Sequence, residues 1–165
     1  MSLIRGRVWK FGDNINTDAM APGFAFKAPW EELKRLILHL HPRFPFEVRI
    51  GDVVVAGRNW GCGSSREQAP ANLKRLGIGC VLAESFGRIY FRNSVALAFP
   101  SLVCPGVSRA FSEGDELELE LETARVRNLT SGETLQGETL SRDMLAIIAA
   151  GGILPTLKAR LKRSR

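Results

Sequence analysis

One stretch of the chain, VVVAGRNWGCGSSREQA from Val53 to Ala69, joins an apolar run to a glycine-rich polar turn. The run from Val53 to Ala56 is mostly β-branched and has the length of a buried strand. Residues 71–76, beyond the turn, are typical of a helix that ends at Gly77. The sequence therefore predicts a strand that leads through a tight turn into a helix. In open α/β sheets this is where ligands usually bind.

The turn carries groups that suit an anion. Gly61 and Gly63 permit positive φ angles and a close approach of a ligand to the backbone. The start of the following helix offers free N–H groups and the positive end of the helix dipole. Arg66 adds a planar fork that can hold a carboxylate through two hydrogen bonds. We therefore expect a carboxylate or phosphate to bind here, where Ser64 or Ser65 can act on it.

Other interpretations explain fewer residues of the turn. Ser64 and Glu67 fit the S-x-x-E capping box, which leaves the glycines and the arginine unexplained. A dinucleotide fingerprint requires glycine at position 66, and a P-loop requires Gly-Lys-Ser/Thr. The two histidines, His39 and His41, are expected to face solvent at the end of a helix, so a serine-hydrolase triad is not expected. A non-catalytic anion-binding module remains an alternative.

Composition indicates a single globular domain spanning residues 1–165, with 45% hydrophobic and 24% charged residues. Five cations lie within residues 158–165, so the net charge of +6 leaves only +1 for the rest of the chain. We interpret residues 158–165 as a frayed basic tail and expect no nucleic-acid partner. No apolar run reaches the length of a membrane span, and the N-terminus lacks a signal-peptide core. We therefore expect a cytoplasmic protein with no membrane partner.

The order of the expected elements predicts an α/β fold. Strands over 4–11 and 52–56 are followed by alternating helices and strands over 71–76, 78–83, 85–97 and 102–104; an earlier helix is expected over 29–40. This alternation favours a parallel core sheet flanked by helices, with right-handed crossovers. Strands over 116–122, 125–129 and 133–135 add antiparallel partners, and Ser141 caps a last helix. The 116–122 strand, which alternates acid with leucine, is expected to be half exposed.

The three cysteines, Cys62, Cys80 and Cys104, are widely spaced and form no C-x-x-C pair. Their odd number argues against disulfides, and zinc or an iron–sulfur cluster requires a tighter group of ligands. Cys80 and Cys104 fall in apolar runs and are expected in the core. We therefore predict no metal site on this chain.

Two loop motifs together resemble a known family: GCGSSRE at Gly61–Glu67 and GDNINTD at Gly12–Asp18. The likeness continues through AESFGRIYFRNS at Ala83–Ser94 and the segment Ala149–Leu154, and it covers nearly the whole chain in order. These motifs are similar to those of 3-isopropylmalate dehydratase small subunits, which correspond to the swivelling β/β/α domain of the aconitases.

The resemblance implies half of a hydro-lyase used in leucine biosynthesis. A separate large subunit would hold a 4Fe–4S cluster, this chain would bind no cofactor, and the two would form a heterodimer or heterotetramer. The substrate would be a malate-type hydroxy-diacid, with 3-isopropylmalate favoured, isomerised by dehydration and rehydration. By the same analogy Ser64 would be the catalytic base. Arg66, Ser65 and the loop amides at Gly63 would bind a substrate carboxylate.

The sequence departs from the family pattern in two places. Relatives usually carry a Tyr-Leu-containing segment where this chain has Phe24-Ala25-Phe26-Lys27, and Gln68 replaces a common histidine. Phe24 and Phe26 could pack an alkyl group such as isopropyl, or merely anchor a loop. Lys27 could meet an additional carboxylate, or simply face solvent. The alternative substrates are therefore the dicarboxylates and tricarboxylates of sister enzymes, a methylated malate or homoaconitate.

Overall fold

The computed structural model describes residues 2–164, which form one seven-stranded sheet in the order β4-β3-β2-β1-β5-β6-β7. Four strands are parallel: β1 (Leu3–Lys10), β2 (Val53–Ala56), β3 (Val81–Ala83) and β4 (Ser101–Val103). Three more continue the sheet antiparallel: β5 (Glu116–Glu120), β6 (Arg125–Asn128) and β7 (Thr134–Gln136). The predicted α/β fold, with a parallel core and antiparallel additions, is confirmed.

The strand β1 joins the two halves of the sheet. Its second half pairs with β2 in parallel, with Val8 opposite Val53. Its first half pairs with β5 in the antiparallel sense, with Leu3 opposite Glu120. The carboxyl ends of β1, β2 and β3 therefore lie side by side at one edge of the sheet.

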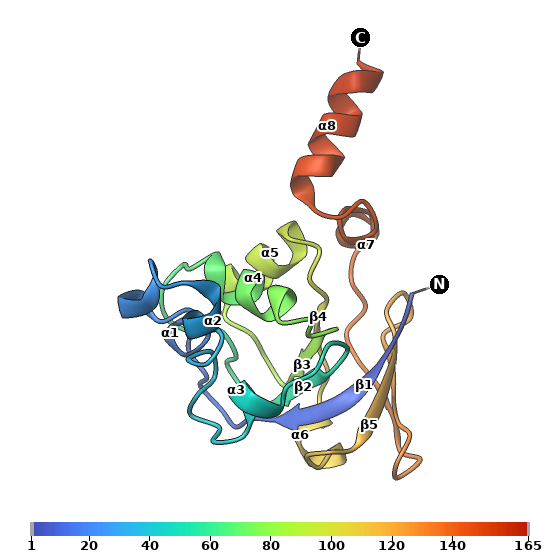
Figure 1. Cartoon of the computed structure of the whole chain (residues 1–165). Coiled ribbons are helices and arrows are strands. Elements are labelled where there is room, and N and C mark those ends of the chain that lie inside the picture. The colour runs from blue at the N-terminus through green and yellow to red at the C-terminus, as the bar shows by residue number, and fades with distance from the viewer. Residues whose placement is uncertain (1, 165) are drawn as a thin grey trace.

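Helices cover both faces of the parallel strands (Figure 1). They are α1 (Thr17–Met20), α2 (Trp30–Leu33), α3 (Phe44–Glu47), α4 (Gln68–Arg75), α5 (Arg88–Ala96), α6 (Val107–Ala110), α7 (Arg142–Ala149) and α8 (Ile153–Arg163), with a 3-10 turn at Gly23–Ala25. In Figure 1, α4 and α5 lie on one side of these strands and α6 on the other.

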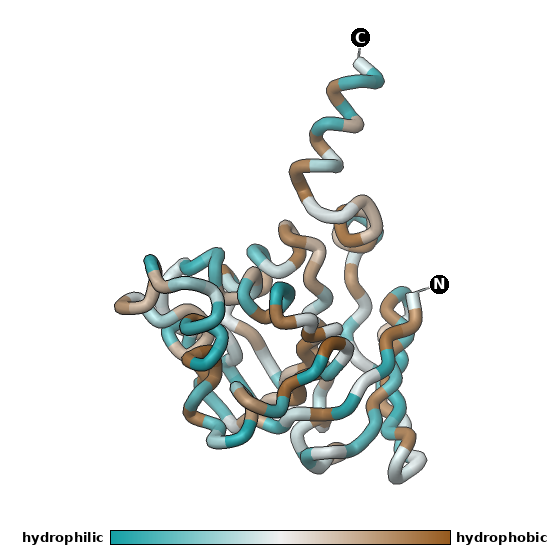
Figure 2. The backbone as a smooth tube through the Cα atoms, in the orientation of Figure 1, coloured by the Kyte–Doolittle hydropathy of each residue, from teal (hydrophilic) through white to brown (hydrophobic). Residues whose placement is uncertain are grey.

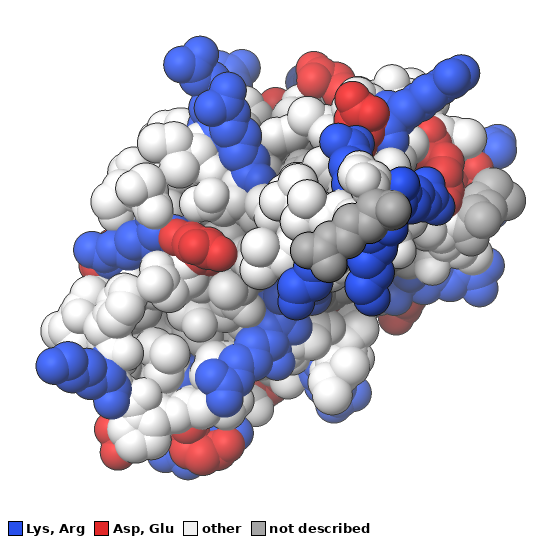
Figure 3. Space-filling view, turned by 90° about the horizontal axis from the view of Figure 1, so that it is seen from above, with Lys and Arg blue, Asp and Glu red and all other residues white. Residues whose placement is uncertain are grey.

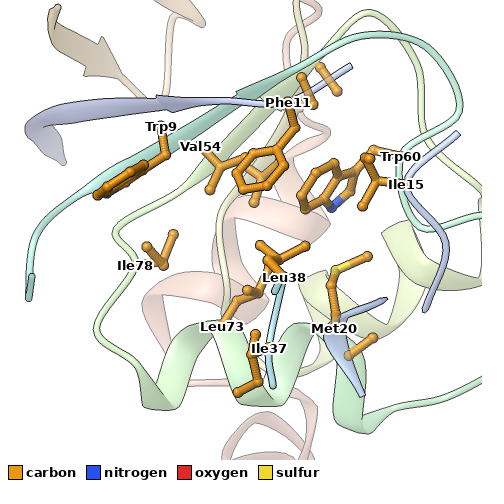
Figure 4. Packing of buried hydrophobic residues seen from close by; sticks show 14 of the residues in the cluster. Trp9, Phe11, Ile15, Met20, Ile37, Leu38, Val54, Trp60, Leu73 and Ile78 are labelled. Atoms are coloured by element: carbon orange, nitrogen blue, oxygen red, sulfur yellow. The ribbon is translucent and has the colours of Figure 1, made fainter. Parts of the chain in front are cut away.

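The valine run of β2 is buried on both faces, which explains why it does not alternate with polar residues. Val54 packs with Trp9, Phe11, Trp60 and Leu73 under the helices (Figure 4). Its neighbours on the strand, Val53 and Val55, point into a second cluster on the opposite face, together with the leucines of β5. This two-sided burial fixes β2 as a central strand and holds the turn that follows it.

The helix expected over residues 29–40 is wrong beyond its first turn. The helix α2 ends at Leu33, and residues 34–40 form turns. Leu38 is fully buried with a φ of +52°, and its N–H donates to the carbonyl of Ala19 at 2.7 Å. A left-handed residue cannot continue an α-helix, so tertiary packing overrides the helical periodicity here.

His41 is also not the solvent-facing residue that we expected. Its ring lies edge-on to Trp9, with centroids 5.1 Å apart, and its Nε2 lies 2.6 Å from a carboxylate oxygen of Glu113. The chain turns back at this point, which brings the ring onto the aromatic cluster of β1. The sequence gives no sign of Glu113 as a partner, since 72 residues separate the two.

The strand β5 differs from the expected half-exposed pattern at one residue. Glu118 is only 3% exposed, although it carries a charge. The register places Arg5 and Arg127 opposite it on the two neighbouring strands, at 2.5 Å and 3.0 Å from its carboxylate oxygens. The two guanidinium groups supply the opposite charge that a buried carboxylate requires.

The basic C-terminal segment is helical rather than frayed over its described part. The helix α8 runs to Arg163 and projects from the body of the molecule (Figure 1). Apolar and polar residues alternate around it (Figure 2), and basic side chains outnumber acidic ones on the face seen from its side of the molecule (Figure 3). Within residues 2–164 no single helix is long and apolar enough to cross a membrane; α7 and α8 reach that length only as a pair bent by 93°.

Candidate active site

Three loops that follow β1, β2 and β3 meet at the carboxyl edge of the sheet. Backbone hydrogen bonds join them: Thr17 N–H to Cys62 O at 2.9 Å, Gly61 N–H to Ile15 O at 2.7 Å, and Trp60 N–H to Ser85 O at 3.0 Å. The glycine turn therefore lies where the sequence predicts it. Both neighbouring loops come from the family motifs, so the structure brings together segments that are distant in the sequence.

Buried hydrophobic residues anchor both sides of this polar edge. Ile15 and Met20 flank the segment 16–19, and Trp60 precedes the turn; all three side chains enter the same core cluster (Figure 4). Gly61 has a φ of +75° and lies against Tyr90, so a Cβ at this position would come within 2.2 Å of the tyrosine ring. The base of the turn is thus fixed by close packing that only glycine allows.

Ser64 lies on the exposed part of the turn and contacts one buried side chain. Its Oγ lies 3.3 Å from Oγ1 of Thr17, and its carbonyl accepts hydrogen bonds from that hydroxyl at 3.0 Å and from the N–H of Arg66 at 2.9 Å. The helix α4 begins only at Gln68 and has no side-chain cap. The capping-box alternative is therefore wrong. Gly63 and Ser65 are exposed beside Ser64.

Arg66 folds back onto the first loop. Its Nη1 bonds to the carboxylate of Asp18 and to the carbonyl of Ala21, the latter at 2.7 Å. The hydrogen bond from Arg66, together with one from the N–H of Gly23, holds the pKa of Asp18 below its usual value. Both recorded guanidinium bonds within residues 2–164 leave from Nη1. The Nη2 and Nε donors are left for a carboxylate ligand.

The segment Phe24–Lys27 borders this guanidinium. A Cβ on Gly23, the residue before this segment, would lie 3.3 Å from Nη2 of Arg66. Phe24 is 80% exposed and Phe26 57% exposed, and Lys27 is exposed as well. Phe26 and Gln68 line a common cavity of about 50 Å³, so the two departures from the family pattern meet at one place. Within residues 2–164 the recorded hydrogen bonds of Ser64 go to Thr17 and Arg66, and none goes to Phe24, Phe26 or Lys27.

Two site residues escaped the sequence reasoning. Thr17 and Asp18 belong to the motif Gly12–Asp18, and the sequence predicts no role for either. In the structure the Thr17 hydroxyl contacts that of Ser64, and Asp18 forms an ion pair with Arg66. Their partners lie 47 and 48 residues away, and no local pattern reports that distance. The adjacency of β1 and β2 in a parallel sheet is the one signal that could have placed the two loops together.

The cysteines are not arranged as cluster ligands. Cys80 and Cys104 are buried in the core, as expected, and burial raises the pKa of both thiols, that of Cys104 to about 11. Cys62 is partly exposed in the glycine turn. Within residues 2–164 no group of three or more His, Cys, Asp or Glu side chains could hold a metal ion. These residues do not fit a 4Fe–4S cluster.

Known proteins are similar to this chain in sequence and in fold. The family profile described as "Aconitase C-terminal domain" matches residues 43–103. An isopropylmalate/citramalate isomerase small subunit from Methanocaldococcus jannaschii is 47% identical over 99% of both chains, and a methanogen homoaconitase small subunit from Methanothermobacter thermautotrophicus is 41% identical over 92% of this chain and 89% of that one. A crystal structure of 3-isopropylmalate dehydratase from Methanocaldococcus jannaschii superposes with a TM-score of 0.90 and 37% identity, covering 99% of this chain and 98% of that one. The chain therefore belongs to the family of 3-isopropylmalate dehydratase small subunits, in the aconitase superfamily.

Proposed function

We propose that this chain is the small subunit of a hydro-lyase that isomerises 3-isopropylmalate and 2-isopropylmalate in leucine biosynthesis. One observation carries the proposal: Ser64 and Arg66 lie on one turn that backbone hydrogen bonds join to the neighbouring loops, and within residues 2–164 the recorded bonds of the Arg66 guanidinium leave from Nη1. A hydroxyl beside a cation with free donors suits proton abstraction next to a carboxylate.

Ser64 acts as the base in this reaction. In dehydration the Ser64 alkoxide takes the proton from the carbon next to a carboxylate, hydroxide leaves the neighbouring carbon, and a carbon–carbon double bond forms. The proton on Ser64 and the departing hydroxide together make up the water that is lost. Rehydration reverses these steps with the hydroxyl placed on the other carbon. A serine alkoxide requires a site that excludes water and directs dipoles at the charge. The loop amides and Arg66 supply the dipoles on this chain, whereas Ser64 is exposed, so the large subunit must exclude the water.

Arg66 fixes the substrate through one of its carboxylates. Its Nη2 and Nε form a bidentate fork, while Asp18 and Ala21 hold Nη1. Ser65 and the backbone at Gly63 are exposed on the same turn and complete the carboxylate site. Orientation by several donors at once is what places the reacting carbon within reach of Ser64.

The other half of the site belongs to a large subunit. The small-subunit naming of the relatives supports such a partner, and the misfit of the cysteines supports placing the 4Fe–4S cluster on it. We propose that the two chains form a heteromer and that this chain alone has no activity. The mass of the purified complex would distinguish a heterodimer from a heterotetramer.

Reconstitution tests the proposal. The large subunit with this chain should dehydrate 3-isopropylmalate, whereas either chain alone should not. Ser64→Ala should abolish turnover and preserve the complex, while Ser112→Ala, at an exposed serine on another loop, serves as the matched control. Near-normal turnover by Ser64→Ala would rule out the base assignment, and dehydration by this chain alone would rule out the division of labour.

A sister substrate is the second candidate, favoured by the exposed Lys27, four residues after Gly23, whose Cβ position faces Arg66. A tricarboxylate such as homoaconitate would gain an ion pair from Lys27, whereas citramalate and isopropylmalate would not. Lys27→Ala should therefore lower kcat/KM about tenfold for a tricarboxylate and leave dicarboxylates unchanged. The control is Lys158→Ala on α8, and equal losses for all substrates would contradict a role in selection.

A further inference from the structure

Thr17 contacts the glycine turn at three points; because it carries Ser64, this turn (Gly61–Glu67) is called the serine turn below. Its N–H donates to Cys62 O at 2.9 Å, and its Oγ1 lies 3.0 Å from the carbonyl oxygen and 3.3 Å from the Oγ of Ser64. The side chain is only 2% exposed, although that of Ser64 is exposed. A buried hydroxyl therefore supports the proposed base from the protein side and leaves the other side open to substrate.

The hydrogen atoms in this cluster can be assigned by counting donors. Thr17 has a single hydroxyl hydrogen, and the carbonyl of Ser64 can only accept. With that hydrogen directed to the carbonyl, the contact between the two hydroxyls must be donated by Ser64 Oγ. The proton of neutral Ser64 therefore points at Thr17, and a lone pair of Ser64 is left for another partner.

The arrangement changes when Ser64 carries negative charge. An alkoxide can only accept, so the Thr17 hydroxyl rotates and donates to it over the same contact. Hydrogen bonds to an ionised oxygen are shorter and roughly twice as strong as those between neutral groups. Since a bond to the charged form favours that form, the exchange stabilises the Ser64 alkoxide relative to the neutral hydroxyl.

We propose that Thr17 is a positioning residue of this hydro-lyase, whose buried hydroxyl fixes the Ser64 side chain and stabilises its alkoxide. The inference rests on the proposed role of Ser64 as base. If Thr17 served only to satisfy the Ser64 carbonyl, its loss would change the stability of the turn and leave the pH dependence of the reaction unchanged.

Thr17→Val and Thr17→Ser in the reconstituted enzyme distinguish these roles. Valine keeps the shape and removes the hydroxyl, so kcat should fall about 10- to 100-fold with little change in KM. The pH at which kcat rises to its plateau should shift upward, because the alkoxide has lost a donor. Serine keeps the hydroxyl and should retain kcat within about threefold of the parent. The matched control is Thr156→Val, which removes a hydroxyl that donates to the Gly152 carbonyl at 2.8 Å on α8.

Failure of this inference can be told apart from failure of the proposed function. An unchanged kcat and pH profile in Thr17→Val, or equal losses in the valine and serine variants, would overturn the role of Thr17 while Ser64→Ala remained inactive. Retained turnover in Ser64→Ala would overturn both. Should valine prevent folding, judged by circular dichroism and binding to the large subunit, Thr17→Ala provides the same pH comparison. A loss in Thr17→Ala without a pH shift would refute the inference.

Discussion

Gly61→Ala is expected to be among the most damaging small substitutions in this chain. The φ of +75° costs alanine about 1–2 kcal/mol relative to glycine. The new Cβ would also come within 2.2 Å of the Tyr90 ring, and such overpacking in a core typically costs about 1–3 kcal/mol more. We therefore expect a loss of about 2–5 kcal/mol in the free energy of unfolding.

Gly132→Ala isolates the packing part of this cost. Gly132 has a similar φ of +83° on the β6–β7 turn, but nothing lies within 4 Å of its Cβ direction. It should lose only about 1–2 kcal/mol. The difference between the two variants corresponds to about 2–12 °C in Tm for a chain of this size, measurable by thermal unfolding.

A third variant tests whether the Tyr90 side chain causes the excess cost of Gly61→Ala. In a Tyr90→Ala background, Gly61→Ala should lose part of its excess cost, because the Cγ and Cδ2 atoms that the new Cβ would overlap are gone and only the Tyr90 Cβ position remains. The reasoning is refuted if Gly61→Ala costs no more than Gly132→Ala, or if the excess is unchanged without the Tyr90 ring. Activity of the reconstituted enzyme should fall with the same order of variants, since Gly61 is the base of the serine turn.

Two further predictions concern carboxylates. Burial alone would raise the pKa of Glu84, but hydrogen bonds from the Ser108 side chain and from the N–H groups of Ser108 and Gly106 lower it overall. Because the pKa of Glu84 is depressed in the folded state, its carboxylate stabilises the fold near neutral pH, and this stabilisation is lost as the pH falls through the folded pKa. Glu84→Gln should therefore lower the free energy of unfolding by about 1–2 kcal/mol near neutral pH and by progressively less in acid. Urea unfolding at several pH values measures this difference. Asp18→Asn should raise KM about 3- to 30-fold with a smaller change in kcat, because it removes the charged partner of Arg66 Nη1, leaves the Ala21 carbonyl to hold that atom, and so orients the guanidinium less firmly. A lower KM would mean instead that Asp18 competes with substrate.

Local chemistry explains why much of the fold was predictable. The run Val53–Ala56 is apolar on both faces, and that property belongs to the residues themselves. Ser141 caps α7 by accepting from the N–H of Met144, again within one turn of chain. Leu38 and His41 were not predictable, because the first adopts a left-handed backbone under tertiary packing and the second is held by Glu113, far along the chain.

In the candidate site too, some features follow from the local sequence and others depend on tertiary contacts. Positive φ at Gly61 and Gly63 and the exposure of Ser64 follow from a tight turn after a buried strand. The contacts of Thr17 and Asp18 do not, because they depend on a bridge between Asn16 and Cys62 that forms only when β1 and β2 are neighbours. Sequence chemistry thus predicted the groups that are proposed to react, and the sheet order explains which residues contact them.

For the proposed reaction this chain needs further reacting groups from the large subunit, whereas the shape of the serine turn is set by contacts within the chain. The serine turn is held by bonds to Ile15, Thr17 and Ser85, all from this chain, and its anchors lie in the core. We therefore expect this turn to fold without a partner, so that the large subunit completes the site by docking against a preformed surface. This predicts that the amides of Gly61 and Thr17 exchange slowly with solvent in the isolated chain, because each donates to a carbonyl of the neighbouring loop. Fast exchange that slows only in the complex would show that the partner orders the turn instead.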